Sequence, residues 1–316
     1  MNKSEPKTKI LMIGGPTATG KSALAVSLAQ AFNGEVINGD AYQVYRGMDI
    51  GTAKVTAAEM AGVPHHLIDI VAPSDPFSVV QFKRRAQAAI TAITARGKLP
   101  IVVGGTGFYL NALRLDLPLG GAAPPTPLRT ELQTAAPADL WARLNAVDPV
   151  AAAKIPVGNT RRVIRALEVI QTTGVRVSEQ PPPTPAYNAL VLGLTTERAA
   201  LYARIDARVN QMIAAGLVAE VQTLLKTVPP SAQALQAIGY KELVPYVQGT
   251  VPLAAAVAAI QQHSRRYAKR QLTYFRHQMP THWFDLLAHP EIQPEITALV
   301  DAWSKNSMED KNELER

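Results

Sequence analysis

The stretch Gly15-Pro16-Thr17-Ala18-Thr19-Gly20-Lys21-Ser22 decides the fold of this chain. It matches the pattern G-x-x-x-x-G-K-[ST] of a P-loop. The short apolar run Ile10–Ile13 before it predicts a buried strand, and Leu24 and Leu28 recur at helical spacing after it. Strand, glycine-rich loop and helix are the context that this motif requires, so we favour a phosphate-binding loop over a turn without a ligand.

The chemistry of such a loop is anion binding. Glycines let backbone N–H groups turn toward an anion, and the N-terminus of the following helix adds the positive end of its dipole. Lys21 supplies a mobile positive charge for phosphate oxygens, and the hydroxyl of Ser22 can hold Mg²⁺. The loop therefore predicts a site for a phosphate or diphosphate, without saying which molecule carries it.

The composition narrows the class of protein. The chain has 316 residues, of which 47% are hydrophobic and 18% charged, so it can bury a substantial core. No apolar run is long enough for a membrane span or a signal peptide, and the absence of cysteine excludes disulfides and cysteine zinc sites. The net charge of +7 favours a polyanionic partner. We expect a cytoplasmic enzyme that makes no membrane contact and acts as a monomer.

Two further strands are predicted, and each is followed by a candidate site segment. Residues 35–38 read as a strand that leads to Asp40, and in a parallel sheet Asp40 would lie near the glycine-rich loop. The alternative for Asp40 is a turn-capping aspartate. Residues 99–103 form the next strand, before Gly104-Gly105-Thr106-Gly107. Glycines there would let a ligand approach the backbone, and a plain strand-to-helix turn is the alternative.

The segments between these strands give weaker signals. Residues 49–54 are small and carry one lysine, which favours a solvated loop over a phosphate contact. His65 and His66 are adjacent on an extended chain and point to opposite faces, so structural histidines are favoured over a metal site. Asp69 could serve as the strand-end aspartate that helps to hold Mg²⁺ in P-loop enzymes.

Proline clusters divide the chain. They lie near residues 118–127 and 181–185 and enclose predicted helices at 127–134, 138–147 and 159–173. Outside them, 78–96 and 197–225 read as helices, the second broken at Gly216, and 190–194 as a returning strand. The predicted fold class is α/β, a P-loop NTPase-like parallel sheet flanked by helices. Its core is residues 1–116 and 188–303, with a helical insertion at 117–187 and a polar tail at 304–316.

Basic residues concentrate in two helical segments. Arg161 and Arg165 share a helix face, and a solvated face with Arg165 paired to Glu168 is the usual meaning of such a pattern. The segment 263–277 holds five Lys or Arg residues and no acid, with aromatic residues between them. That combination favours nucleic-acid binding over a charged helix with buried aromatics. Arg265, Lys269 and Arg276 fall on one face of this helix. Arg204 and Arg208 could point at a phosphate or at solvent.

Together these segments resemble the bacterial tRNA isopentenyltransferase family, the tRNA dimethylallyltransferases. The matching pieces keep their order along nearly the whole chain, which makes them more specific than a P-loop alone. They are residues 15–22, Asp40 with 43–45, 49–54, 64–69, 104–107, 165–169, 238–241 and 269–271.

The resemblance implies a reaction. A dimethylallyl group passes from dimethylallyl diphosphate to the exocyclic N6 amine of the adenosine 3′ of the anticodon, in tRNAs that read codons starting with U, and diphosphate is released. Mg²⁺ is the implied metal, with Ser22 as its ligand. Asp40 is the implied general base, Thr17 a hydrogen-bond donor to the leaving oxygen, and Arg208 a contact of the diphosphate.

The resemblance also implies two sets of binding residues. The diphosphate would lie on Gly15, Pro16, Thr17, Ala18, Thr19, Gly20, Lys21 and Ser22. The anticodon stem-loop of tRNA would contact Asp40, Ala41, Tyr42, Gln43, Thr106, Arg161, Arg162, Val163, Ile164, Arg165, Gln236, Ala237, Ile238, Gly239, Tyr240, Lys241, Lys269, Arg270, Gln271, Leu272, Thr273, Tyr274, Phe275 and Arg276. One departure is Ala41, where the family usually has serine after the aspartate.

Three alternatives remain at this point. A prenyltransferase acting on free adenine nucleotides would share the loop, but the insertion and the basic helix argue for tRNA. A small-molecule kinase would bind ATP at the loop and release ADP instead of diphosphate. An RNA-binding protein gated by a nucleotide would leave the RNA chemically unchanged.

Overall fold

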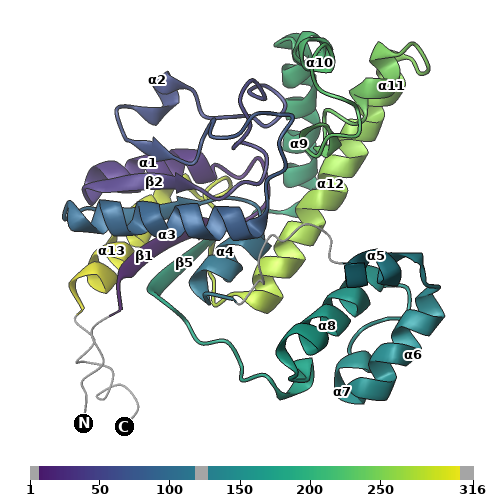
Figure 1. The fold of residues 1–316 in the computed structure, drawn as a ribbon. Helices are drawn as coiled ribbons and strands as arrows, with labels where there is room; N and C mark the ends of the chain where they lie inside the picture. Colours follow the sequence, from purple (N-terminus) through teal and green to yellow (C-terminus); the bar gives the residue numbers. More distant parts are fainter. Residues whose placement is uncertain (1–6, 118–126, 307–316) are drawn as a thin grey trace, which may run out of the picture. The chain divides into compact units, whose positions relative to one another are not determined.

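The computed structural model describes residues 7–117 and 127–306 (Figure 1). The chain forms two compact units, one of residues 1–117 and 185–316 and the other of residues 118–184. In the described part of the chain, no helix is both long and apolar enough to cross a membrane. The polar tail predicted from Ser304 is corrected at its start, because helix α13 continues to Lys305. Residues 307–316 of that tail lie outside the described residues.

The larger unit is built on a six-stranded sheet with the order β3-β2-β4-β1-β5-β6, in which every pair of neighbours is parallel. This confirms the predicted α/β class. The sequence analysis missed β6, a three-residue strand after the basic helix. The strands are β1 (Lys9–Gly14), β2 (Gly34–Asn38), β3 (His65–His66), β4 (Leu99–Val103), β5 (Asn188–Leu194) and β6 (His282–Phe284).

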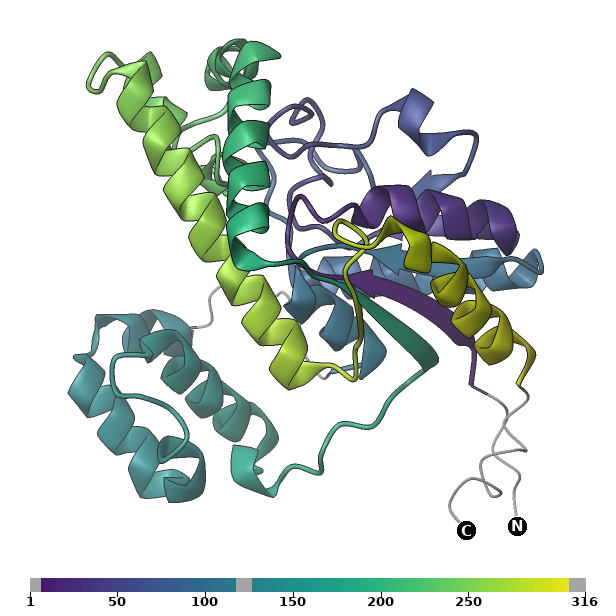
Figure 2. The ribbon, with the colours of Figure 1, turned by 180° about the vertical axis from the view of Figure 1, so that it is seen from behind.

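Both faces of the sheet are covered by helices, as Figures 1 and 2 show from opposite sides. Side chains alternate along a strand, so Leu11 and Ile13 of β1 face one layer, and Ile10 and Met12 face the other. The first layer is α1 and α13, and the second includes α3, α4 and α12. All four of these β1 side chains are fully buried, which explains why the strand reads as an unbroken apolar run.

The helices of the larger unit follow local sequence signals. Ser78 caps α3 and forms a capping box with Gln81, and Gly216 separates α9 from α10 at a φ of 102°, which confirms the predicted break. Helix α4 follows the glycine-rich turn after β4, which agrees with the strand-to-helix alternative for that turn. The helices are α1 (Lys21–Ala31), α2 (Ala57–Met60), α3 (Val79–Ala95), α4 (Gly107–Arg114), α9 (Arg198–Ala214), α10 (Leu217–Leu225), α11 (Leu243–Val247), α12 (Leu253–Gln278) and α13 (Gln293–Lys305).

The smaller unit is helical and has its own core. Its helices are α5 (Pro127–Thr134), α6 (Pro137–Val147), α7 (Pro149–Ala152) and α8 (Thr160–Thr173). Leu140, Leu144 and Val163 are buried together at its centre. The indole of Trp141 donates to the carbonyl of Ile155 at 2.9 Å, which ties the chain after α7 to α6. The predicted insertion, residues 117–187, covers this unit.

A buried carboxylate joins the edge of the sheet to the chain around β4. Glu35 on β2 is 3% exposed, and its carboxylate lies 2.6 Å from Arg96, 2.7 Å from His66 and 3.0 Å from Lys98. Burial opposes ionisation, but the hydrogen bonds from these three partners outweigh it and lower the pKa of Glu35 to about 2. His66 therefore has a structural role, as predicted.

We expect Glu35→Gln to destabilise the protein by about 2 kcal/mol at pH 7, because it leaves the charges of Arg96 and Lys98 around a neutral amide. A depressed pKa stabilises the fold above the ordinary carboxyl range, and this stabilisation is lost as the pH falls toward 2. The difference between the two proteins should therefore shrink below about pH 4.5. Urea unfolding at several pH values measures it. Asp301→Asn is the control, because its ion pair with Lys305 is exposed. Equal effects of the two substitutions would contradict the account.

Candidate active site

The glycine-rich loop of residues 15–20 leaves the carboxyl end of β1 and enters α1 at Lys21. A Cβ on Gly15 would lie 2.4 Å from the carbonyl oxygen of Leu194, so only glycine fits beside β5. Gly20, at a φ of 88°, turns the chain into the helix. The Lys21 ammonium donates to the carbonyl of Pro16 at 2.5 Å, and the Thr19 hydroxyl donates to the same carbonyl at 2.9 Å. The lysine is thus folded back over its own loop.

Asp40 follows β2 and caps its own turn, which was one of the two alternatives for it. Its Oδ1 accepts hydrogen bonds from the backbone N–H of Tyr42 at 2.8 Å and of Gln43 at 3.4 Å. The same carboxylate also lies in the fields of Lys21 and Arg208. The second alternative, a place beside the glycine-rich loop, is therefore realised as well.

Burial and neighbouring charges have opposite effects on the pKa of Asp40. Burial raises the pKa of Asp40, although the capping N–H groups and the charges of Lys21 and Arg208 act to lower it. Burial also lowers the pKa of Lys21 to about 7, helped by the positive charge of Arg208 and opposed by Asp40. One carboxylate and two cations therefore share a poorly hydrated site, an arrangement typical of functional groups.

Helix α9 brings two arginines to the loop. Arg204 and Arg208 are one turn apart, and the Arg204 Nε donates to the carbonyl of Ala18 at 3.1 Å. Ala18 has a φ of 66°, in the left-handed region. Burial lowers the pKa of Arg208, against the attraction of Asp40. Arg204 thus contacts the backbone of the loop, which neither of its two predicted positions, at a phosphate or in solvent, included.

Helix α12 also contacts the glycine-rich loop, through Gln271. The side chain of Gln271 donates to the carbonyl of Gly105 at 2.8 Å and accepts from the backbone N–H of Thr17 at 3.3 Å. It links the glycine-rich loop to the turn after β4. In that turn, the Thr106 hydroxyl oxygen accepts from the N–H of Ala41 at 3.3 Å and shares a hydrogen bond with Tyr267 of α12.

The glycines after β4 lie against side chains of α12. A Cβ on Gly105 would lie 2.2 Å from the Gln271 amide nitrogen, and one on Gly107 would lie 2.5 Å from the ring of Tyr274. The contacts account for these glycines through the packing of the strand-to-helix turn, which was one of the two alternatives. Their small size lets α12 pack directly against the turn.

Several side chains predicted to contact tRNA are buried inside the units. They support the neighbouring surface and do not form it, because a polynucleotide can reach only exposed atoms. Gln271 is one example, held between two loops. The set is Val163, Ile164, Ala237, Tyr240, Gln271 and Phe275.

The basic residues of α12 differ in their exposure and in their partners. Lys269, Arg270 and Arg276 are exposed. Arg265 instead forms an ion pair with Asp206 of α9 at 2.5 Å, so its charge is already paired within the protein. The sequence segment contains no acid, but the fold supplies one from another helix. In the smaller unit, Arg161 and Arg162 are exposed, and Arg165 lies 3.7 Å from Glu168.

Lys54 and Asp69 also differ from expectation. The Lys54 side chain is only 6% exposed, and its ammonium binds Asp49 and Asp69 at 2.5 Å each. The prediction of a solvated loop is therefore wrong at Lys54. Because the charge of Asp69 is neutralised by Lys54, Asp69 has a structural role and is not supported as a magnesium ligand.

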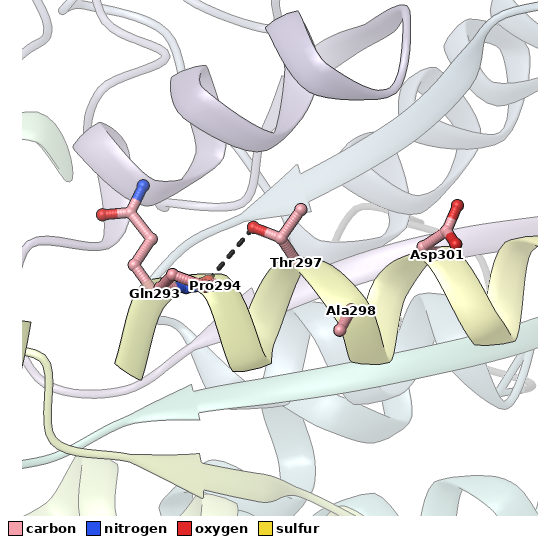
Figure 3. A pocket seen from close by; sticks show the side chains of 5 residues that line it. All are labelled: Gln293, Pro294, Thr297, Ala298 and Asp301. Carbon is pink, nitrogen blue, oxygen red and sulfur yellow. Dashed lines mark hydrogen bonds between the residues drawn. The ribbon is translucent and has the colours of Figure 1, made fainter. Parts of the chain in front are cut away.

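No other place in the described residues combines the groups that a diphosphate or a metal ion needs. Within residues 7–117 and 127–306, no group of three or more acidic or histidine side chains could hold a metal ion alone. A shallow recess of about 720 Å³ runs along α13 and is lined by Gln293, Pro294, Thr297, Ala298 and Asp301 (Figure 3). Its lining includes a carboxylate and no cation, which does not suit a diphosphate.

Sequence reasoning missed Tyr267 as a site residue. Its ring lies beside the Arg270 guanidinium at 5.5 Å, its hydroxyl bonds Thr106, and burial raises its pKa to about 12 with help from the charge of Asp40. The signal was its position four residues before Gln271, on the same helix face. The many basic residues around Tyr267 drew attention to nucleic-acid binding and away from this contact.

The fold and site define a class: a parallel α/β protein that places an anion-binding type of loop, a half-buried carboxylate and two arginines at one sheet edge. The model of the IPP transferase family matches residues 43–278, and that of isopentenyl transferase matches residues 8–75. The chain therefore belongs to the IPP transferase family and is a prenyltransferase.

Similar proteins cover almost the whole chain. A tRNA dimethylallyltransferase of Lacticaseibacillus casei is 62% identical over 95% of this chain and 99% of its own length. A solved tRNA isopentenylpyrophosphate transferase of Bacillus halodurans is 46% identical and superposes with a TM-score of 0.74, covering 94% of this chain and 97% of that one. A eukaryotic dimethylallyltransferase acting on tRNA superposes at 0.83 with 30% identity, over 96% of this chain and 81% of its own.

We expect Arg208→Gln to raise the pKa of Asp40 further, because it removes a positive charge that stabilises the carboxylate. Titration of the aspartate carboxyl carbons by NMR measures this value, with the Asp40 signal assigned from its loss in Asp40→Asn. Arg198→Gln, on the exposed start of the same helix, is the control and should leave the signal unchanged. An unchanged or lower pKa in Arg208→Gln would show that Arg208 does not act on Asp40.

Proposed function

We propose that this chain transfers a dimethylallyl group from dimethylallyl diphosphate to the exocyclic N6 amine of the adenosine 3′ of the anticodon. The substrates are tRNAs that read codons starting with U. The observation that carries the proposal is that the carboxylate of Asp40 interacts with the charges of Lys21 and Arg208 beside the glycine-rich loop. The names of the similar proteins support tRNA as the acceptor. The enzyme is proposed to be monomeric and cytoplasmic.

The diphosphate of the donor is proposed to lie on residues 15–22. As the carbon–oxygen bond of the donor breaks, negative charge grows on the leaving diphosphate. Lys21, Arg208 and the loop N–H groups stabilise that charge in a poorly hydrated site. Thr17, whose backbone is held by Gln271, donates to the leaving oxygen through its side chain. Lys21 exchanges its present bond to Pro16 for phosphate oxygens.

Asp40 is proposed as the general base. The adenine amine is a weak nucleophile because its lone pair is delocalised into the ring. It must lose one proton as the new carbon–nitrogen bond forms, and the carboxylate of Asp40 accepts that proton. A raised pKa suits this task, because a base whose pKa is closer to the working pH accepts a proton more readily.

Mg²⁺ fits the residues present. Magnesium is usually bound by one or two protein oxygens together with substrate phosphates and water, so it does not need the acidic cluster that the described residues lack. The exposed hydroxyl of Ser22, at the start of α1, would hold it. When bound, the ion supplies positive charge to the diphosphate oxygens.

The acceptor adenosine cannot react while it is stacked in the anticodon loop, so we propose that it is flipped into the site. Thr106 and Gln43 line its route. Ala41 lacks the hydroxyl of the serine that the family usually has at this position. Its backbone N–H donates to the hydroxyl oxygen of Thr106. Arg161 and Arg162 of the smaller unit, with Lys269, Arg270 and Arg276 of α12, hold the tRNA backbone.

We expect Asp40→Asn to lower turnover by about 10²–10⁴-fold while tRNA affinity is retained, because the amide cannot accept the proton but keeps the shape of the carboxylate. Unmodified tRNA is incubated with Mg²⁺ and dimethylallyl diphosphate, and its nucleosides are analysed by mass spectrometry. Filter binding measures the affinity. Near-normal turnover would remove Asp40 from the role of base.

The same assay separates the alternatives. Wild-type enzyme should leave free adenine nucleotides unmodified and should release diphosphate in proportion to modified adenosine. Modification of free AMP in preference to tRNA would favour the free-nucleotide reaction. Release of ADP from ATP without prenylation would indicate a kinase.

Lys269→Ala should weaken tRNA binding and reduce the salt dependence of log Kd by about one, because one phosphate contact is lost. Affinity is measured across a series of salt concentrations. Lys305→Ala removes an exposed lysine paired with Asp301 on α13 and is the matched control. A slope that stays the same in Lys269→Ala, or falls equally in both variants, would place Lys269 outside the phosphate contacts.

A further inference from the structure

Glu220 of α10 holds a loop that lies far from it in the sequence. Its carboxylate accepts hydrogen bonds from three successive backbone N–H groups, those of Asp49 at 2.9 Å, Ile50 at 2.8 Å and Gly51 at 3.1 Å. The hydroxyl of Tyr240 donates a fourth bond, at 2.5 Å. A carboxylate offers about four acceptor positions, so this one is fully used by the protein.

Tyr240 supports the same loop from below, and we call Glu220 and Tyr240 together the clasp of residues 49–51. Its ring is fully buried under the loop, where a Cβ on Gly51 would lie 2.4 Å from it. The N–H of the preceding Gly239 donates to Glu242 at 2.8 Å, and the other carboxylate oxygen of Glu242 contacts His263 of α12 at 2.7 Å. The clasp is therefore anchored to the helix that carries the exposed basic residues.

The clasped loop is bonded in turn to the segment that holds Asp40. The side-chain amide of Gln43 donates to the carbonyls of Thr52 at 3.1 Å and Ala53 at 3.4 Å. The backbone N–H of the same Gln43 caps the Asp40 carboxylate. A continuous path of hydrogen bonds thus leads from Glu220 through the loop and Gln43 to Asp40.

We propose that Glu220 and Tyr240 are positioning residues that fix the place of the Asp40 carboxylate through the loop at residues 49–53 and Gln43. The inference rests on the proposed function, because it takes Asp40 as the base. Neither residue touches a reacting atom. Their effect is on how often the carboxylate stands where it can accept the proton, and a misplacement of about 1 Å can reduce a rate by about 10²-fold.

Glu220→Gln tests the clasp with little change in shape. The amide keeps one acceptor oxygen but directs N–H donors at the N–H groups of the loop, so part of the loop loses its partners. The experiment is a single-turnover measurement with the enzyme in saturating excess over tRNA, in the presence of Mg²⁺ and dimethylallyl diphosphate. The rate constant measured in this way is independent of the fraction of enzyme that is folded.

We expect the rate constant to fall about 10–100-fold in Glu220→Gln, with tRNA affinity within about twofold of wild type. Tyr240→Phe keeps the ring and loses only the hydroxyl, so it should cause a smaller fall in the same direction and keeps the test open if Glu220→Gln does not fold. Glu197→Gln is the matched control, because its carboxylate also accepts a backbone N–H, at the exposed start of α9.

A double-mutant cycle with Gln43→Ala shows whether the effect travels along the path. If it does, the double variant loses much less than the product of the two single losses, because the second substitution acts on a path already broken. An unchanged single-turnover rate constant with a lowered melting temperature would overturn the inference. Multiplicative losses in the cycle would overturn it too.

Asp40→Asn is measured alongside. If Asp40→Asn is inactive while Glu220→Gln is normal, the positioning role fails and the proposed function stands. If Asp40→Asn turns over normally, Asp40 is not the base and the positioning role loses its premise, while absence of any prenylated adenosine with the wild-type enzyme would show that the proposed function itself fails.

Discussion

The parallel register of three strands is the constraint on which the site depends. β4 lies between β1 and β2, with Leu11 paired to Ile101 and Val36 paired to the same residue on the other side. The carboxyl ends of all three strands therefore meet at one edge of the sheet, where ligands of such folds bind. This pairing alone brings the glycine-rich loop, Asp40 and Thr106 together, although they are separated by up to 90 residues along the chain.

Helices α9 and α12 surround the charged groups at this edge and reduce their contact with water. α9 delivers Arg208 to Asp40 and Lys21, and α12 fastens the glycine-rich loop to the turn after β4 through Gln271. In this setting, burial raises the pKa of the carboxylate and lowers the pKa of the lysine. The same exclusion of water would strengthen every contact to a bound diphosphate, so one packing arrangement serves the base and the leaving group.

The sequence predicted the features that depend on local pattern. The buried strands, the glycine-rich loop and the break at Gly216 each have a signal within a few residues. Long-range pairing was not predictable. The acid that neutralises Arg265 comes from α9, the partners of Glu35 come from residues 66, 96 and 98, and the glycines after β4 are explained by α12. Strand β6 was missed because three residues are too few for a period to show.

The decisive measurement is a crystal structure of this protein with the thiodiphosphate analogue of the donor and an anticodon stem-loop. We expect the diphosphate on residues 15–22, within reach of Lys21 and Arg208. We also expect a flipped adenine whose N6 lies within about 3 Å of the Asp40 carboxylate. A diphosphate bound elsewhere, or an adenine amine out of hydrogen-bond reach of Asp40 with the analogue in place, would contradict the proposed mechanism.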